Sequence, residues 1–144
     1  MQTTSVTIEW HNWGLCCGDD MVFEKTTVSK ASSTIHIKQY NGHRGILLDE
    51  RVAVNLGALQ EFFEFIDRIA EAEQWTVDYS VDVCDGFMWN MYIRQGRAKR
   101  IKLHGTVEPP PYGEEIERRI RHMLLEANAL VNPELFCALQ CEEA

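Results

Sequence analysis

Apolar and polar residues alternate through most of the stretch from Trp75 to Leu103, which predicts three consecutive antiparallel strands. The first strand carries its apolar side chains at odd-numbered positions from 75 to 83, and the second continues the pattern from 87 to 93. A three-residue loop at residues 84–86 would set Val81 opposite Trp89 and keep one face of this hairpin wholly apolar. In that register Trp89 is predicted to be a core anchor.

The first half of the chain predicts four more strands by the same alternation. The first, at residues 6–10, stops at Gly14. The others are expected at residues 21–28, 34–40 and 45–49, with Asn41-Gly42 as the turn of a hairpin between the last two.

Two longer segments show the period of amphipathic helices. The first runs from about Asn55, a favourable N-cap, to Gln74, and its outer face is acidic. The second begins near Gly113, after three prolines, and runs to about Val131. The two apolar stripes comprise Leu56, Leu59, Phe62, Phe63, Ile66, Ile69 and Ala70, and then Ile116, Ile120, Met123, Leu124, Ala127 and Val131.

These elements form a weak internal repeat. A shift of 54 residues lays Ile35 on Trp89 and Phe62 on Ile116, so two units, about residues 20–74 and 75–131, each contain a hairpin, a strand and a helix. We therefore predict that residues 1–144 form a single α+β domain: an antiparallel sheet of six or seven strands with two long helices on one face. The other face of the sheet would be partly open.

The formal net charge of −8 narrows the classes of partner. A general nucleic-acid-binding surface is basic, so this acidity counts against nucleic acid. No apolar run approaches the ~20 residues that cross a bilayer, and the N-terminal residues lack a signal-peptide pattern, so no membrane partner is expected. The five cysteines are then expected as reduced thiols in a cytoplasmic protein.

One segment departs from the acidic average. If Ile93 pairs with Ile101, then Arg94 faces Arg100 and Tyr92 faces Lys102 on the outer surface of the sheet. Like charges directly opposite each other destabilise a sheet. Either Asp78, Asp82 or the acidic helix compensates for them, or the strip receives an anion from a partner. The candidate binding residues of this strip are Tyr92, Arg94, Arg97, Arg100 and Lys102.

Trp13 is a further candidate binding residue. It breaks the inward parity of its strand, so we expect either an exposed ring at a binding lip or a cap on the sheet edge.

No set of residues fits a known catalytic arrangement. The five histidines are scattered, and neither a serine elbow nor a phosphate-binding loop is present. Cys16 and Cys17, with His11 nearby, invite a metal interpretation, but adjacent cysteines rarely ligate zinc together and no C-x-x-C pair occurs. We expect no catalytic residue, metal site or cofactor. The alternative is a small metal- or thiol-dependent enzyme that uses this cluster.

The block Asp85-Gly86-Phe87-Met88-Trp89-Asn90-Met91-Tyr92-Ile93, followed by Gly105 and Pro109, resembles a pattern in a family of small uncharacterised Gram-positive, mainly clostridial, bacterial proteins. That pattern is D-G-x-x-W-x-x-x-I, a turn, a strand ending in Gly, and a Pro before a C-terminal helix. Here the usual single Pro is a run of three, and the strand after the turn is unusually basic. The resemblance covers residues 81–130 and implies a bacterial cytoplasmic α+β protein, without a known activity or functional residue.

The sequence therefore favours a non-catalytic protein-interaction or regulatory module with a protein partner. The same features suit a homodimer that buries the open sheet face. An RNA binder that uses Arg94, Arg97 and Lys102 beside Tyr92 is a third interpretation, which the overall acidity counts against.

Overall fold

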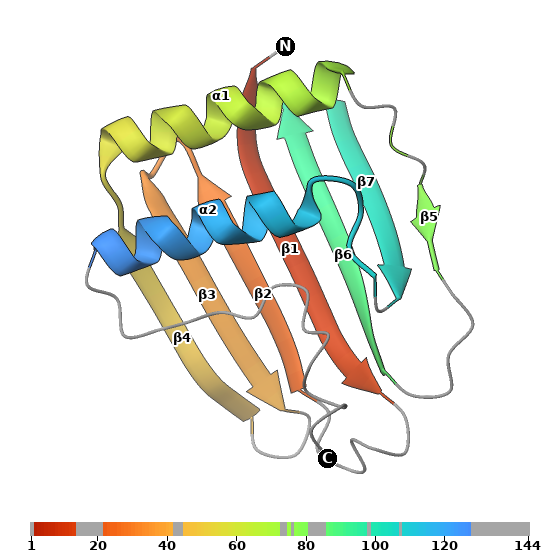
Figure 1. Ribbon diagram of the computed structural model, residues 1–144. Helices are drawn as coiled ribbons and strands as arrows, with labels where there is room; N and C mark the ends of the chain where they lie inside the picture. The colour runs from red at the N-terminus through yellow and green to blue at the C-terminus, as the bar shows by residue number, and fades with distance from the viewer. Residues whose placement is uncertain are drawn as a thin grey trace.

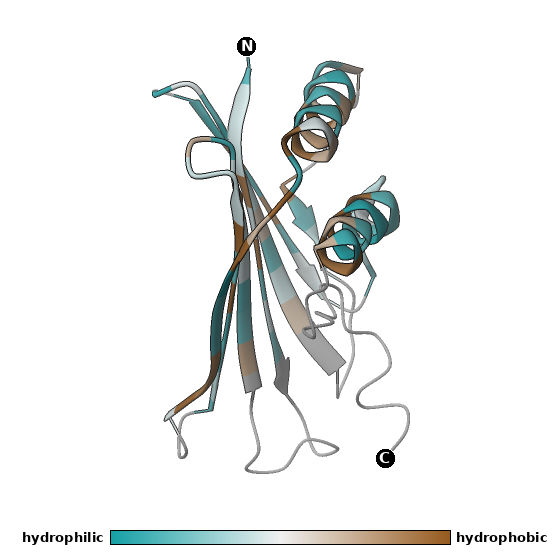
Figure 2. Cartoon of the chain, turned by 90° about the vertical axis from the view of Figure 1, so that its left-hand side faces the viewer, coloured by the Kyte–Doolittle hydropathy of each residue, from teal (hydrophilic) through white to brown (hydrophobic). Residues whose placement is uncertain are grey.

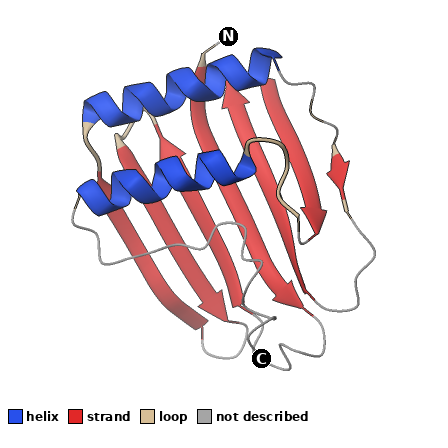
Figure 3. Ribbon diagram, in the orientation of Figure 1, coloured by secondary structure: helices blue, strands red, loops and turns tan. Residues whose placement is uncertain are grey.

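Seven strands form one sheet in the order β4-β3-β2-β1-β6-β7-β5, and two helices accompany it (Figures 1 and 3). The computed structural model describes residues 2–13, 22–41, 45–72, 75, 77–80, 86–97, 99–106 and 108–127, without the side chains of 12, 13, 22, 86 and 87. The elements are β1 (Thr3–Trp13), β2 (Val22–Ser29), β3 (Thr34–Asn41), β4 (Gly45–Ala53), α1 (Leu56–Ala72), β5 (Asp78–Tyr79), β6 (Gly86–Gln95), β7 (Lys99–Thr106) and α2 (Gly113–Glu126). The predicted α+β class is confirmed.

The first four strands form the antiparallel half of the sheet that the alternation predicts. β1 pairs with β2, β2 with β3, and β3 with β4, each antiparallel. Asn41 lies opposite Gly45, so β3 and β4 are a hairpin, as its Asn-Gly signal predicts. β4 extends beyond its predicted end to Ala53.

The predicted hairpin between residues 75–83 and residues 87–93 is wrong. Only Asp78 and Tyr79 form a strand in the described part of residues 75–83, and this strand, β5, pairs in parallel with β7 at the sheet edge. The neighbours of Trp89 are Trp10 of β1 and Gly105 of β7, in place of Val81. The apolar positions of β1 therefore occupy the side of β6 that the prediction gave to residues 75–83.

The predicted register of the hairpin between β6 and β7 is confirmed. Ile93 lies opposite Ile101, Met91 opposite Leu103, and Arg94 opposite Arg100. Gly96, in the intervening turn, has a φ of +67°, a conformation that favours glycine.

Both helices begin where the sequence predicts. The Asn55 side chain accepts a hydrogen bond from the Ala58 N–H at 3.0 Å, which is N-cap geometry for α1. Of the predicted stripe on α1, Leu56 is 68% exposed, whereas Phe65, which the stripe omits, is buried. Residues 128–131, the predicted end of the second helix, lie outside the described residues.

Figures 1 and 2 show both helices over the same side of the sheet. Strand residues on this side are buried with the helix residues in one core; the largest fully buried side chains include Trp89, Phe62, Phe63, Ile8, Ile35 and Ile116. Among the described residues, neither helix has the length and apolar character needed to span a membrane.

Candidate functional site

The face of the sheet that points away from the helices is polar and accessible. Strand register assigns its residues, because side chains directly opposite each other across a ladder share a face. Arg94 lies opposite both Ser5 and Arg100, Ser5 lies opposite Ser29, and Ser29 lies opposite Thr34. The polar face therefore runs across β7, β6, β1, β2 and β3, and continues onto β4.

Cations dominate this face, which we call the basic face. Among the described residues, six cations from β2, β3, β4, β6 and β7 lie on this face: Lys25, Lys38, Arg51, Arg94, Arg100 and Lys102. Carboxylates on the same face are Glu9, Asp49 and, at the β5 edge, Asp78. Because the whole chain has 14 basic and 22 acidic residues, this local excess of positive charge reverses the average of the molecule.

The paired arginines stand at the centre of the predicted strip. Arg94 and Arg100 are exposed and lie directly opposite each other on β6 and β7. The Arg100 guanidinium lies 4.1 Å from the centre of the Tyr92 ring, and the Lys102 ammonium lies 5.8 Å from it. Stacking on an aromatic face holds a cation without neutralising it. Arg100 is thereby held in place with its charge available to a partner.

Tyr92 also links the strip to β1. Burial, together with the nearby Glu9 carboxylate that accepts its hydrogen bond, raises the pKa of the Tyr92 hydroxyl. Tyr92 therefore stays a neutral donor through the physiological range, and Lys25 is the residue opposite Glu9 on β2.

Two hollows make the basic face concave. One, of about 510 Å³, is lined by Arg94, Arg100, Tyr92 and hydroxyl-bearing residues of β1 and β2. The other, of about 530 Å³, is lined by Lys38, Arg51 and His36. Both hollows share Glu9 and Lys25, so they join into one groove across the strands.

Two described acids of the sheet, Asp78 and Asp49, have histidine partners in place of Arg94 or Arg100. Asp78 lies 3.7 Å from His104 Nδ1 at the far edge of the sheet, and hydrogen bonds from Ser80 lower the pKa of Asp78. Asp49 binds His36 at 2.6 Å, and this hydrogen bond, with smaller effects of His36, Lys38 and Arg51, lowers the pKa of Asp49. Asp82 lies outside the described residues.

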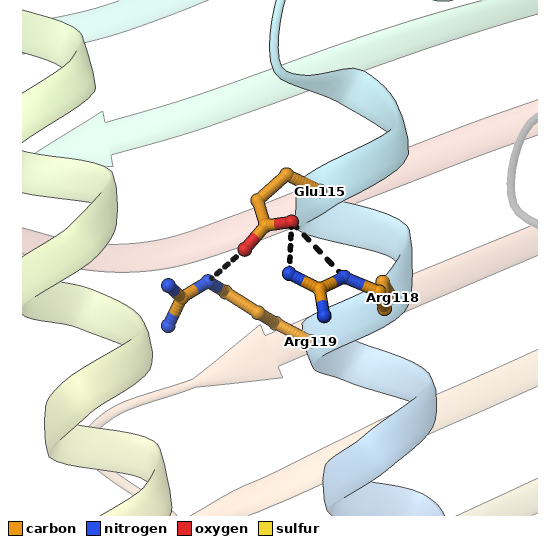
Figure 4. Close-up of polar contacts among 3 residues, drawn as sticks. All are labelled: Glu115, Arg118 and Arg119. Atoms are coloured by element: carbon orange, nitrogen blue, oxygen red, sulfur yellow. Dashed lines mark hydrogen bonds and ion pairs between the residues drawn. The ribbon is translucent and has the colours of Figure 1, made fainter.

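The helix layer carries the opposite charge, and three arginines of α2 form ion pairs within their own helix. In α2, Glu115 accepts hydrogen bonds from Arg118 and Arg119 (Figure 4), and Arg121 contacts Glu117 at 2.5 Å. The Arg118 hydrogen bond and charge hold the pKa of Glu115 below its usual range. In contrast with the basic face, these arginines are already paired within the helix.

The remaining candidates do not add a cation to the groove within the described residues. Arg97 is exposed in the turn between β6 and β7. Trp13 ends β1, but its side chain is outside the description, as are all five cysteines, including Cys16 and Cys17. His11 packs on Phe23 with ring centres 5.1 Å apart, and burial lowers its pKa. Within the described residues, no three metal-ligating side chains cluster.

Three cations of the basic face were not identified from the sequence: Lys25, Lys38 and Arg51. Each stands in a separate strand, so no local run of positive charge marks it. The alternation predicts which face of its own strand each cation occupies. It does not predict the strand order that brings them beside Arg94.

Neither the protein-family models nor the curated proteins contain a match to this chain. The resemblance to the clostridial family therefore stays a prediction.

Proposed function

We propose that this protein is a non-catalytic interaction module whose basic face binds an acidic surface of a partner protein. The observation that carries the proposal is the set of six cations on one concave sheet face of a chain with a net charge of −8. A charge distribution this uneven steers an oppositely charged partner and orients it before contact.

The paired arginines supply the recognition chemistry. A guanidinium matches a carboxylate with two parallel hydrogen bonds, and Arg94 and Arg100 offer two such groups side by side. Serine and threonine hydroxyls line the same hollow and can donate to further carboxylate oxygens. The groove therefore suits aspartate and glutamate side chains on a protein surface.

An acidic protein fits the basic face better than RNA does. Single-stranded RNA is usually held by bases stacked on exposed aromatic rings. The aromatic ring in the Arg94 hollow, Tyr92, is already covered by Arg100, which occupies the surface on which a base would stack. Face-to-face homodimerisation through the basic face is also disfavoured, since it would oppose like charges.

A titration with poly-L-glutamate tests the proposal. We expect saturable binding to the wild-type chain, and a loss of at least about tenfold in affinity in the Arg94→Glu/Arg100→Glu variant, because two attractive contacts become repulsive. The matched control is Arg118→Glu/Arg121→Glu, which makes the same change of charge on α2 and should bind as wild type does.

Salt and a second polymer complete the experiment. Raising the salt from about 10 mM to about 150 mM shortens the screening length from about 30 Å to about 8 Å and should weaken binding. An equal loss of affinity in the Arg94→Glu/Arg100→Glu and Arg118→Glu/Arg121→Glu variants would mean that only the net charge of the chain matters. It would refute specific binding at the basic face. If a single-stranded RNA of equal charge bound more tightly than poly-L-glutamate, the partner would be RNA and not an acidic protein.

A further inference from the structure

The two edges of the sheet differ in how they are protected. At one edge the short strand β5 pairs with the end of β7. At the other edge β4 is nine residues long and has a strand neighbour, β3, on one side only within the described sheet. Long edge strands offer a row of unpaired backbone groups to another strand, and natural proteins protect most of them.

β4 also exposes apolar side chains beside that edge. Ile46 is 62% exposed and Leu47 is 46% exposed. The charges that follow, Asp49, Glu50 and Arg51, are of mixed sign. Charges of one sign repel a second copy of the same edge, but Asp49 and Arg51 attract each other when two copies run antiparallel.

The strand period limits the possible registers. If the helix layers of both copies are to lie on the same side, even-numbered residues from Leu48 to Val52 must meet even-numbered residues of the copy, because the bulge between Ile46 and Leu48 reverses the parity of β4 before Leu48. Among such two-fold registers, the one centred on Glu50 sets Asp49 of each copy opposite Arg51 of the other. It also sets Leu48 opposite Val52, two partly buried side chains that pack against the core. A register centred on Asp49 would set Asp49 opposite Asp49, and one centred on Arg51 would set Arg51 opposite Arg51. Neither register forms the two Asp49–Arg51 pairs.

We infer that β4 pairs with the β4 of a second copy in this register, which extends the sheet through a two-fold axis at Glu50. The inference uses Arg51 and Asp49 at the margin of the basic face but leaves the hollow at Arg94 and Arg100 uncovered, so it can be tested separately from the proposed function. The register has one unfavourable feature, because Glu50 meets Glu50 of the second copy at the axis and like charges directly opposite are destabilising.

Sedimentation equilibrium of the full chain tests the inference, because single charge reversals at Asp49 and Arg51 should weaken the dimer and the double exchange should restore it. We expect a dimer whose dissociation constant rises at least about tenfold in Asp49→Arg and in Arg51→Asp, since each creates two like-charge pairs. The double exchange Asp49→Arg/Arg51→Asp restores the two ion pairs and the wild-type constant. Glu50→Gln should tighten the dimer.

The control is Lys25→Asp, a charge reversal on the interior strand β2, which should leave dimerisation unchanged. Each variant is checked by its melting curve so that loss of folding is separated from loss of pairing. A wild-type chain that stays monomeric, single variants that dimerise normally, or a double exchange that fails to restore the dimer although it is folded would each overturn the inference. None of these results would affect binding of poly-L-glutamate to the basic face.

Discussion

Trp89 joins the sheet to the chain that enters α2. Its side chain is fully buried, and its indole N–H donates to the Glu108 carbonyl at 2.8 Å. The ring also stacks near Tyr79, with centres 6.2 Å apart. A single residue therefore fixes β6, β5 and the segment before α2 relative to one another.

Replacing this ring should be among the most destabilising single changes. We expect Trp89→Ala to cost about 3–5 kcal/mol of unfolding free energy, because a buried aromatic leaves a cavity. The measurement is urea unfolding of the variant and of Trp89→Phe, which keeps most of the ring and should lose less. A wild-type midpoint in Trp89→Ala would contradict the core position of Trp89.

His11 predicts a pH dependence of stability. Its ring packs on Phe23, its Nδ1 is buried and has no hydrogen-bond partner among the described residues, and burial lowers its pKa. The unfolded chain, whose histidine pKa is about 6.5, therefore binds the proton more readily than the folded chain does. The contribution of His11 to stability is present above that pKa and decreases as the pH falls through it, until the lowered folded pKa is passed.

Comparison of wild type with His11→Gln isolates this effect. We expect the wild type to lose more stability than the variant between about pH 7.5 and about pH 5.5, because glutamine does not titrate. Urea unfolding at the two values gives the difference. Parallel losses in both proteins, or a His11 ring that titrates above the ordinary histidine pKa by NMR, would contradict it.

At the scale of elements, Gly105 explains how β5 can lie beside β7. A Cβ at this position would come within 2.7 Å of the Trp89 ring and 3.0 Å of the Tyr79 Cβ. The absence of a side chain lets the ring of β6 and the side chain of β5 approach the β7 backbone from both sides.

Gly105→Ala should therefore destabilise the chain by about 1–3 kcal/mol, the usual range for an overpacked core. Hydrogen exchange should show faster exchange of the His104 amide, which donates to the Val77 carbonyl at 2.9 Å. Exchange that stays slow at His104, with wild-type stability, would mean that β5 does not pack on β7 in this way.

The same strands show what the sequence can predict and what it cannot. Alternation determines which side of a strand is buried, so the inward positions of β6 were predicted correctly. It does not determine the neighbour, because the inward residues of β1 and of residues 75–83 are equally apolar and either could pair with β6. The β6–β7 register was predictable because a short turn connects its strands.

For the candidate site, the local run of charge at residues 94–102 could be read directly. The contributions of β2, β3 and β4 could not, since they depend on a strand order that joins segments distant in the chain. The helix prediction included Leu56 and omitted Phe65 because the period of the stripe does not specify how far each end of α1 extends over the sheet.

At the scale of the whole molecule, opposite charges lie on opposite sides of the sheet. The basic face carries six cations, whereas α1 has acidic side chains at Glu61, Glu64, Asp67 and Glu71. This separation of charge attracts an acidic partner to the open face of the sheet and repels it from the helices.

NMR observation of the arginine side-chain Nε–H groups during a poly-L-glutamate titration tests the central claim most directly. We expect saturable shifts at Arg94 and Arg100, and unchanged signals from Arg118 and Arg119, whose Nε–H groups already donate to Glu115. Shifts confined to the α2 arginines, or shifts of equal size at all four, would contradict a binding surface on the basic face.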